Sequence, residues 1–138
     1  MNKQVRFMQS IGLVPIRRRT GEYKDDLIAS LLLYYQLSEE TLKSETRRRE
    51  VVEARRIFCY IMRRYDDHLT LRRIGEMIGI SSHATVLHHI RVAESFLVYD
   101  KQFKNDVEQV TRIANAEVLN YDYNFHTSSN LSRPFVMD

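Results

Sequence analysis

Residues 71–91 read LRRIGEMIGISSHATVLHHIR, and this stretch decides the fold. Apolar residues recur in its first half at spacings of three and four, which predicts a short helix with one buried face, made by Leu71, Ile74, Met77 and Ile78. Gly79 follows at once. A glycine just after the last apolar position is the usual end of a helix, because glycine easily adopts left-handed backbone angles. The sequence therefore predicts a helix that ends at Gly79.

A second helix is predicted directly after the first. The hydroxyl of Ser81 or Ser82 is suited to cap the free N–H groups of a following helix. From there the apolar spacing continues through Val86, Ile90, Ala93 and Leu97. Two helices joined by so short a turn form a helix-turn-helix, which places the start of its second helix in the major groove of DNA. The candidate base-reading residues are therefore Ser82, His83, Ala84 and Thr85.

These motifs resemble a known family. The run GISSHATVLHHI resembles the signature of the C-terminal DNA-binding domain (domain IV) of the bacterial replication initiator DnaA, which typically reads GGRDHTTVLHA. The matching residues are Gly79, His83, Thr85, Val86, Leu87 and His88. Upstream, VVEARRIFCYIMRRYDDHLTLRRIGEMIG is similar to the family's VxRPRQxAMYLxRExTxxSLPEIGxxFG, and LLLYYQLSEETLKSETRRR to its VAEYYxIxxxDLxSxxRxR. The resemblance spans roughly residues 24 to 113 and implies a small all-α, helix-turn-helix domain that binds double-stranded DNA.

The pattern of apolar residues predicts the other helices of this domain. They cover residues 24–36, 50–65 and 101–114, and the middle one is the most strongly periodic, with its buried face formed by Val51, Ala54, Ile57, Phe58, Ile61 and Met62. We expect three parts: a basic arm over residues 1–23, the helical domain over 24–114, and a polar, aromatic tail over 115–138. DnaA proteins have an ATP-hydrolysing domain upstream, for which 138 residues leave no room. We expect the DNA-binding module without that motor.

Positive charge gathers around the helix-turn-helix. The net charge of the chain is +3, but residues 47–91 alone hold ten basic and five acidic side chains. This is the distribution expected of a surface that faces phosphates, although arginines also solvate helix faces. The candidate phosphate contacts are Arg47, Arg48, Arg49, Arg55, Arg72 and Arg73. Arg55 is included because it matches the last arginine of the family's RPR element, whose implied role is to anchor a phosphate.

Some departures from the family pattern fall on reading positions. Glu53 stands where the family usually has an arginine that enters the minor groove, and a carboxylate there is repelled by DNA. Ser81 and Ser82 replace the Arg-Asp pair before the histidine, and Ala84 replaces the first threonine. Carboxylates accept hydrogen bonds from cytosine, and threonine methyls contact thymine. We therefore expect DNA binding with a base preference that differs from the standard initiator box.

Several other classes of protein lack support in the sequence. The sequence contains no glycine-rich phosphate loop and no zinc-protease motif, and nothing in the order or spacing of its residues argues for a catalytic set, so we expect no enzymatic activity, no cofactor and no metal site. The resemblance implies that His88 is a packed or hydrogen-bonded structural residue. The single cysteine, Cys59, excludes an internal disulfide, and no apolar run approaches the ~20 residues of a membrane helix. We expect a cytoplasmic protein with no membrane association.

Two hypotheses for the function remain open at this point. In the first, the domain binds double-stranded DNA and regulates replication initiation or transcription. In the second, the fold is retained as a scaffold, and the protein works through a protein partner that binds its arm or its aromatic tail. The arm, which contains Arg17, Arg18 and Arg19, fits a phosphate-tracking segment and a solubilising segment equally well. No pattern in the sequence marks a dimer interface.

Overall fold

The computed structural model of the protein describes residues 19–124, with side chains as far as Ala116. This part of the chain is helical and has no strand, which confirms the all-α prediction; its helices are α2 (Thr20–Tyr35), α3 (Glu39–Leu42), α4 (Arg49–Tyr65), α5 (Leu71–Met77), α6 (His83–Tyr99) and α7 (Lys101–Asn124). Thus α2 begins within the range predicted for the arm, and α7 continues into the range predicted for the tail. The predictions for residues 1–18 and 125–138 lie outside the described residues. Among the described helices, none has the length and apolar character needed to cross a membrane.

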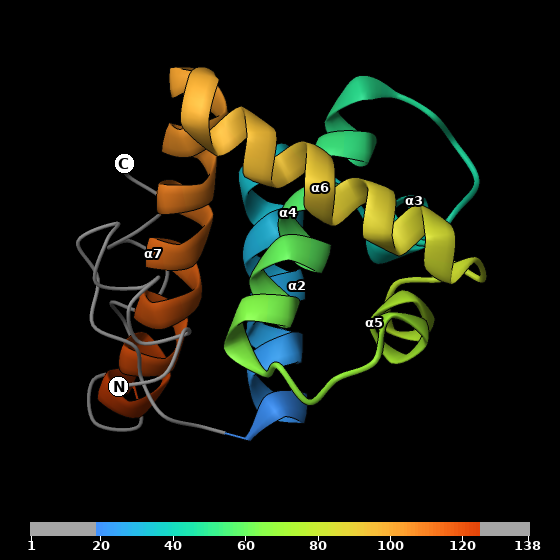
Figure 1. Ribbon diagram of the computed structural model, residues 1–138. Helices are drawn as coiled ribbons and strands as arrows, with labels where there is room; N and C mark the ends of the chain where they lie inside the picture. Colours follow the sequence, from blue (N-terminus) through green and yellow to red (C-terminus); the bar gives the residue numbers. More distant parts are fainter. Residues whose placement is uncertain (1–18, 125–138) are drawn as a thin grey trace.

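Helix α4 runs through the middle of the fold and supplies much of its core. It packs against α2, α3, α5 and α6, while α7 lies along α2 and α6 on one side of the molecule (Figure 1). All six apolar residues predicted to form its buried face have no exposed surface: Val51, Ala54, Ile57, Phe58, Ile61 and Met62. The long apolar face of α4 thus holds the short helix α5 and the reading helix α6 against one common wall.

The helix-turn-helix forms as the sequence predicts. Helix α5 ends at Met77, and Gly79 takes the left-handed conformation, with φ 80°. The N–H of Ile80 then donates back to the carbonyl of Gly75 at 2.8 Å, the six-to-one bond of a Schellman turn. Of the two candidate serines, Ser82 is the one that caps α6, since its hydroxyl accepts a hydrogen bond from the N–H of Thr85 at 3.3 Å.

Helix α6 buries a different histidine from the one expected. His88 was predicted to be a packed or hydrogen-bonded residue, and the packing is wrong: His88 is exposed, whereas its neighbour His89 is only 8% exposed and faces the core. The reason is the helical period, because His89 lies one turn after the buried Val86 and one turn before the buried Ala93. The Nδ1 atom of His89 is buried without a hydrogen-bond partner among the described residues.

The burial of His89 makes the stability of the domain sensitive to acid. Burial, followed by the nearby charges of Arg56, His88 and Arg55, lowers the pKa of His89 from 6.5 to about 4. Between these two pH values the unfolded chain binds more protons than the folded one, so protonation favours unfolding. Stability should therefore decline as the pH falls from about 6.5 to about 4. His89→Leu should flatten this decline, as measured by urea unfolding at several pH values. An equal decline in both proteins would contradict the prediction.

Candidate nucleic-acid interface

The four candidate base-reading residues lie together at the start of α6. Ser82 is the N-cap of the helix, and His83, Ala84 and Thr85 form its first turn. All four residues are exposed, so none of them packs in the core. The N–H groups of a first helical turn add a partial positive charge at the same place. This end of α6 can therefore present hydroxyl, imidazole and methyl groups to another molecule.

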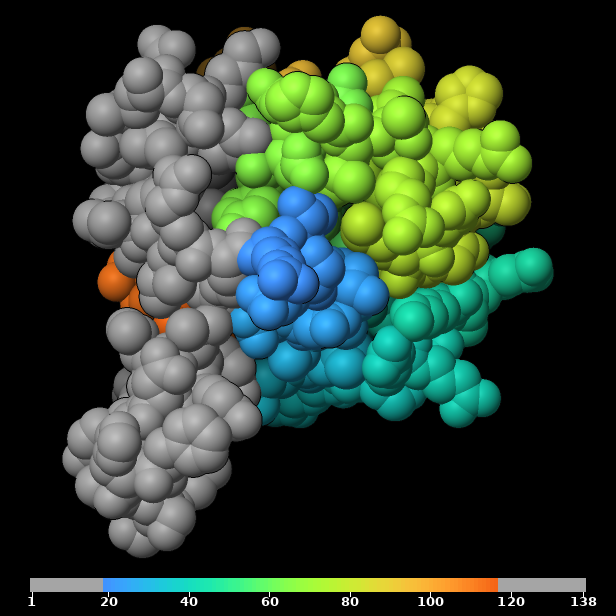
Figure 2. All heavy atoms as spheres, turned by 90° about the horizontal axis from the view of Figure 1, so that it is seen from below, coloured from blue at the N-terminus to red at the C-terminus, as the bar shows by residue number. Residues whose placement is uncertain are grey.

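Two segments rich in arginine lie on either side of this turn. One is the connector between α3 and α4, residues 43–48, which continues into Arg49 at the start of α4; the other is α5 with Arg72 and Arg73. In Figure 1 the first turn of α6 lies between the connector above and α5 below, and Figure 2 shows the connector beside the α5–α6 turn. The contact is close, because a Cβ atom added to Gly79 would be 2.9 Å from the carbonyl oxygen of Lys43.

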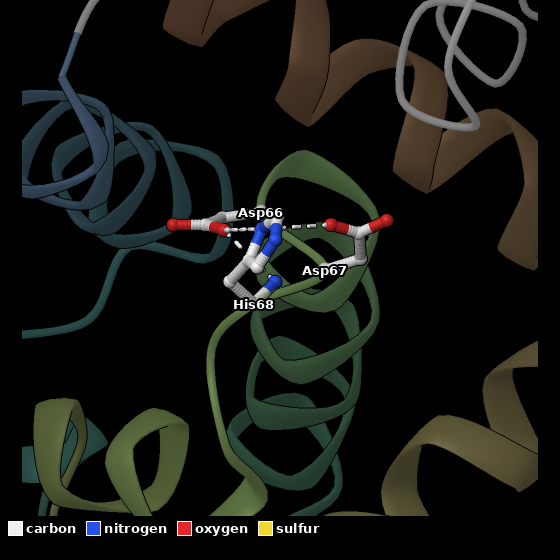
Figure 3. Close-up of side chains that lie close together, drawn as sticks. All are labelled: Asp66, Asp67 and His68. Atoms are coloured by element: carbon white, nitrogen blue, oxygen red, sulfur yellow. Dashed lines mark hydrogen bonds and ion pairs between the residues drawn. The ribbon is translucent and has the colours of Figure 1, made fainter.

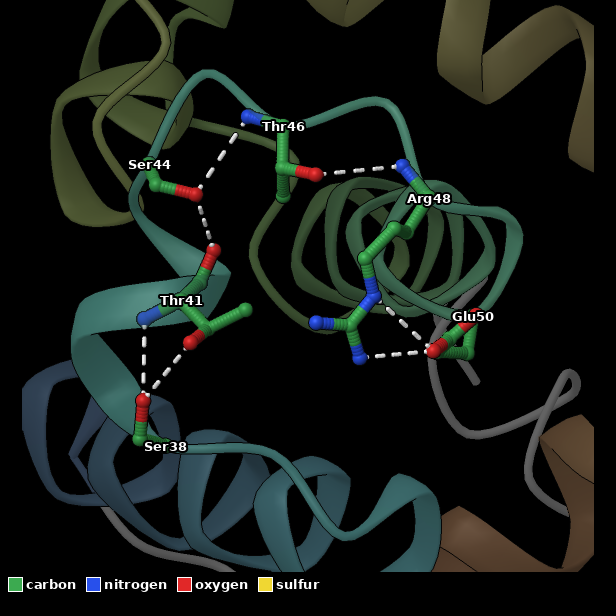
Figure 4. A network of polar contacts seen from close by, with 6 residues as sticks. All are labelled: Ser38, Thr41, Ser44, Thr46, Arg48 and Glu50. Atoms are coloured by element: carbon green, nitrogen blue, oxygen red, sulfur yellow. Dashed lines mark hydrogen bonds and ion pairs between the residues drawn. The ribbon is translucent and has the colours of Figure 1, made fainter.

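The connector is shaped by a chain of short polar contacts (Figure 4). Ser38 caps α3 by accepting a hydrogen bond from the N–H of Thr41 at 3.1 Å. The hydroxyl of Ser44 donates to the carbonyl of Thr41 at 2.7 Å and accepts from the N–H of Thr46 at 3.3 Å. Thr46 in turn accepts from the N–H of Arg48 at 3.3 Å. Serine and threonine here replace the backbone hydrogen bonds that an irregular segment lacks.

Arg55 holds the connector from beneath. Its guanidinium donates from Nε to the carbonyl of Leu42 at 3.0 Å and from Nη1 to that of Thr46 at 2.9 Å, and Nη2 donates to the carbonyl of Ser44. The residue is only 9% exposed, and burial lowers the pKa of its guanidinium. Three of its donors thus serve the fold of the connector. The phosphate-anchoring role expected of Arg55 stays a prediction.

The other five candidate phosphate contacts are exposed. Arg47, Arg48 and Arg49 line the end of the connector, and Arg72 and Arg73 lie in the first turn of α5. Most of them are paired with glutamates nearby in the sequence, which are Glu50, Glu53 and Glu76. Arg47 has no ion-pair partner within residues 19–124. It also lines a shallow hollow of about 360 Å³ together with Arg49, Arg56 and Phe96.

One exposed arginine was missed by reasoning from the sequence. Arg91 lies on the same side of α6 as Ala84 and His88, two turns further along the helix, and it has no ion pair within the described part of the chain. It also lines an open cavity of about 510 Å³ with Arg63, Arg64 and Glu94. The 3.6-residue period, applied from Ala84, would have found it. Arg91 thus adds a positive charge to the exposed side of α6, beyond its first turn.

The loop after α4 brings two carboxylates and an imidazole together (Figure 3). Ligand atoms of Asp66, Asp67 and His68 lie within 4.8 Å of one another, and the side chain of His68 is 95% exposed. Asp66 already accepts hydrogen bonds from the hydroxyl of Thr20 at 2.8 Å and from the N–H of His68 at 3.0 Å. These hydrogen bonds explain why the three side chains lie close together: they belong to the turn that ends α4 and connects it to α2.

Comparison with known proteins places this site in context. Residues 25–92 match the family model described as the bacterial dnaA protein helix-turn-helix. Among relatives, the chromosomal replication initiator protein DnaA of Flavobacterium psychrophilum is 40% identical over 79 residues, which are 57% of this chain and 16% of that protein. The protein of the same name from Gloeobacter violaceus is 33% identical over 99 residues, 71% of this chain and 22% of that protein.

The likeness therefore concerns one part of these relatives. The protein of the same name from Synechocystis is 44% identical over 76 residues, again only 17% of its length. The chain spans 16% to 22% of the length of these three relatives. No solved structure matches it.

Proposed function

Because residues 25–92 are a helix-turn-helix domain of the DnaA family, we propose that this protein binds double-stranded DNA with a preference for sequence. The single observation that carries the proposal is the exposed first turn of α6 between two groups of arginines. A reading helix flanked by phosphate contacts on both sides is the arrangement by which a helix-turn-helix docks in the major groove. The protein acts by occupying its site, with no chemistry of its own.

The first turn of α6 supplies the groups that read bases. The imidazole of His83 can donate or accept a hydrogen bond at a base edge, and the methyl group of Thr85 can contact a thymine methyl. Ser82 keeps its hydroxyl proton for a further bond while its oxygen caps the helix. Ala84 leaves room for the groove wall. Because the acidic side chain of the family's usual signature is absent here, the preferred site should differ from the standard initiator box.

The arginines supply affinity that does not depend on sequence. We assign phosphate contacts to Arg47, Arg48 and Arg49 on one side of the reading turn and to Arg72 and Arg73 on the other. Arg91 adds a contact further along α6. Each phosphate neutralised should steepen the fall of log affinity with log salt by roughly 0.9. The biological role that fits such a binder is the regulation of replication initiation or of transcription.

The test is selection of bound sequences from a random-duplex library. We expect a short enriched motif for the natural protein. His83→Ala should lower the base preference at one position of that motif by roughly five- to a hundredfold, in line with about 1–3 kcal/mol for a good base contact. His68→Ala is the matched control, because His68 is also an exposed histidine but lies outside the reading turn. It should select the same motif as the natural protein.

The remaining outcomes separate the two hypotheses for the function. If the affinity for DNA depended steeply on salt but no motif were enriched, the domain would bind the DNA backbone without reading bases. The absence of any DNA binding would overturn the proposal and favour a scaffold that binds a protein partner.

A further inference from the structure

Four of the arginines assigned to phosphates are paired with carboxylates in the structure, namely Arg48, Arg49, Arg72 and Arg73. Arg48 binds the carboxylate of Glu50 at 2.7 Å through Nη2 and at 3.1 Å through Nε. On the other side of the reading turn, Arg73 lies 3.3 Å and Arg72 3.7 Å from the two carboxylate oxygens of Glu76. The same N–H groups that would contact a phosphate are therefore already directed at a carboxylate.

A third pair lies next to the first. Arg49 is 3.5 Å from Glu53, the residue at the position where the family usually has an arginine. The side chain of Glu53 is only 22% exposed, and it also accepts a hydrogen bond from the hydroxyl of Tyr35 at 3.4 Å. Glu53 is thus bound into the fold as well. Glu50 and Glu76 have side chains 42% and 51% exposed, and among residues 19–124 they make no such tertiary contact.

We propose that Glu50 and Glu76 compete with DNA phosphates for the arginines beside the reading turn. This competition lowers the affinity of the domain for DNA of any sequence. The inference rests on the proposed function and deepens it. One N–H group cannot be given fully to a carboxylate and to a phosphate at once, so a phosphate that takes one of these donors must displace the carboxylate from it. The freed carboxylate then remains within a Debye length, about 8 Å at physiological salt, of the phosphate that replaced it.

This competition would make recognition depend on the bases. Backbone contacts supply most of the affinity for non-specific DNA, and they are the contacts that the glutamates weaken. A helix-turn-helix whose arginines are restrained binds arbitrary DNA poorly, and it accumulates on a site only where the first turn of α6 adds base contacts. The two glutamates lie on opposite sides of that turn, one on each group of arginines, so both flanks of the interface are restrained.

The test compares two doubly substituted proteins of equal charge. E50Q/E76Q removes the two competing carboxylates. D25N/E108Q is the matched control, since Asp25 of α2, which pairs with Lys24, and Glu108 of α7 both lie outside the arginine groups beside the reading turn. Affinity for a random-sequence duplex is measured by fluorescence anisotropy at several salt concentrations, and circular dichroism confirms that each variant is folded.

We expect E50Q/E76Q to bind the random duplex roughly tenfold more tightly than the natural protein at low salt, as judged from the usual strength of exposed ion pairs. The gain should shrink as salt rises, because these interactions are screened. The control should gain less than about twofold, since its charges are farther from the phosphates. Equal gains for the two variants would overturn the inference, because they would reflect net charge alone.

A double-mutant cycle tests whether Glu50 acts through Arg48. If it does, E50Q should raise affinity in the natural protein but not in the R48A protein. The same gain in both backgrounds would overturn the competition and leave only general repulsion between Glu50 and DNA. A natural protein that binds no duplex at all would instead refute the proposed function itself, so that the two failures are distinguishable.

Discussion

Arg55→Ala should lower the free energy of unfolding by about 3 kcal/mol. The substitution removes three hydrogen bonds from a charged, largely buried donor, two to the connector and one to the last residue of α3, each of which is typically worth about 1.5–3 kcal/mol. Part of this loss is offset, because the cost of burying the guanidinium disappears and the connector carbonyls can be hydrated at the surface. Urea unfolding followed by circular dichroism measures the difference.

Two further variants show whether the hydrogen-bonding geometry of Arg55 is responsible for the loss of stability. Arg55→Lys keeps the charge but cannot reach three carbonyls at once, so it should recover less than half of the loss. Arg64→Ala removes an arginine of the same helix that pairs with Glu94 at 4.0 Å, and it should cost less than about 1 kcal/mol. If Arg55→Ala were as stable as Arg64→Ala, the connector would not depend on Arg55.

The same substitution should weaken DNA binding. The connector holds Arg47 and Arg48 beside the α5–α6 turn, and without Arg55 it has fewer contacts that fix its position. We expect a lower affinity together with a smaller salt slope, because fewer phosphates would be engaged. A loss of stability with an unchanged salt slope would show that the connector arginines do not contact phosphates.

Gly75→Ala should destabilise the domain by about 2 kcal/mol, although alanine is the better helix former by about 1 kcal/mol. A Cβ atom at this position would lie 2.4 Å from the carbonyl oxygen of Ile80 and 3.0 Å from Cγ2 of Val86. Both neighbours are fixed: Ile80 is held by its own hydrogen bond to the Gly75 carbonyl, and Val86 is fully buried. The two helices of the reading unit would have to move apart.

Gly21→Ala is the matched control for this prediction. Gly21 also lies in a helix, but a Cβ atom there would meet nothing within 4 Å. It should leave stability unchanged or raise it by up to about 1 kcal/mol. Thermal unfolding of both variants gives the comparison, and selection from the duplex library shows whether Gly75→Ala also blurs the motif. A Gly75→Ala protein as stable as Gly21→Ala would mean that α5 and α6 are not in close contact there.

The positions of the histidines in α6 show where resemblance misled and periodicity did not. His88 matches the family signature, and that match alone suggested a packed side chain. The apolar spacing around it, from Val86 to Ala93, puts His89 on the buried side, as the structure does. A physical pattern in this chain was the better guide to burial at this position than likeness to relatives.

The sequence by itself determined the local structure of this protein. The end of α5 just before Gly79, the serine cap of α6 and the buried face of α4 all follow from spacings and caps that act within a few residues, so they could be predicted without the fold. The exposed position of the first turn of α6 could be predicted from the sequence for the same reason.

Only the tertiary structure decided which polar groups meet. The sequence predicted Arg55 as a phosphate contact, and that role stays a prediction; the fold decided that its guanidinium also donates to backbone carbonyls up to 13 residues away along the chain, which need donors. Charge counts could not show that Glu50 and Glu76 hold the arginines beside the reading turn, nor that Lys43 abuts Gly79. Such contacts depend on how the chain folds back and on which rotamer each side chain takes, and no spacing in the sequence encodes either directly.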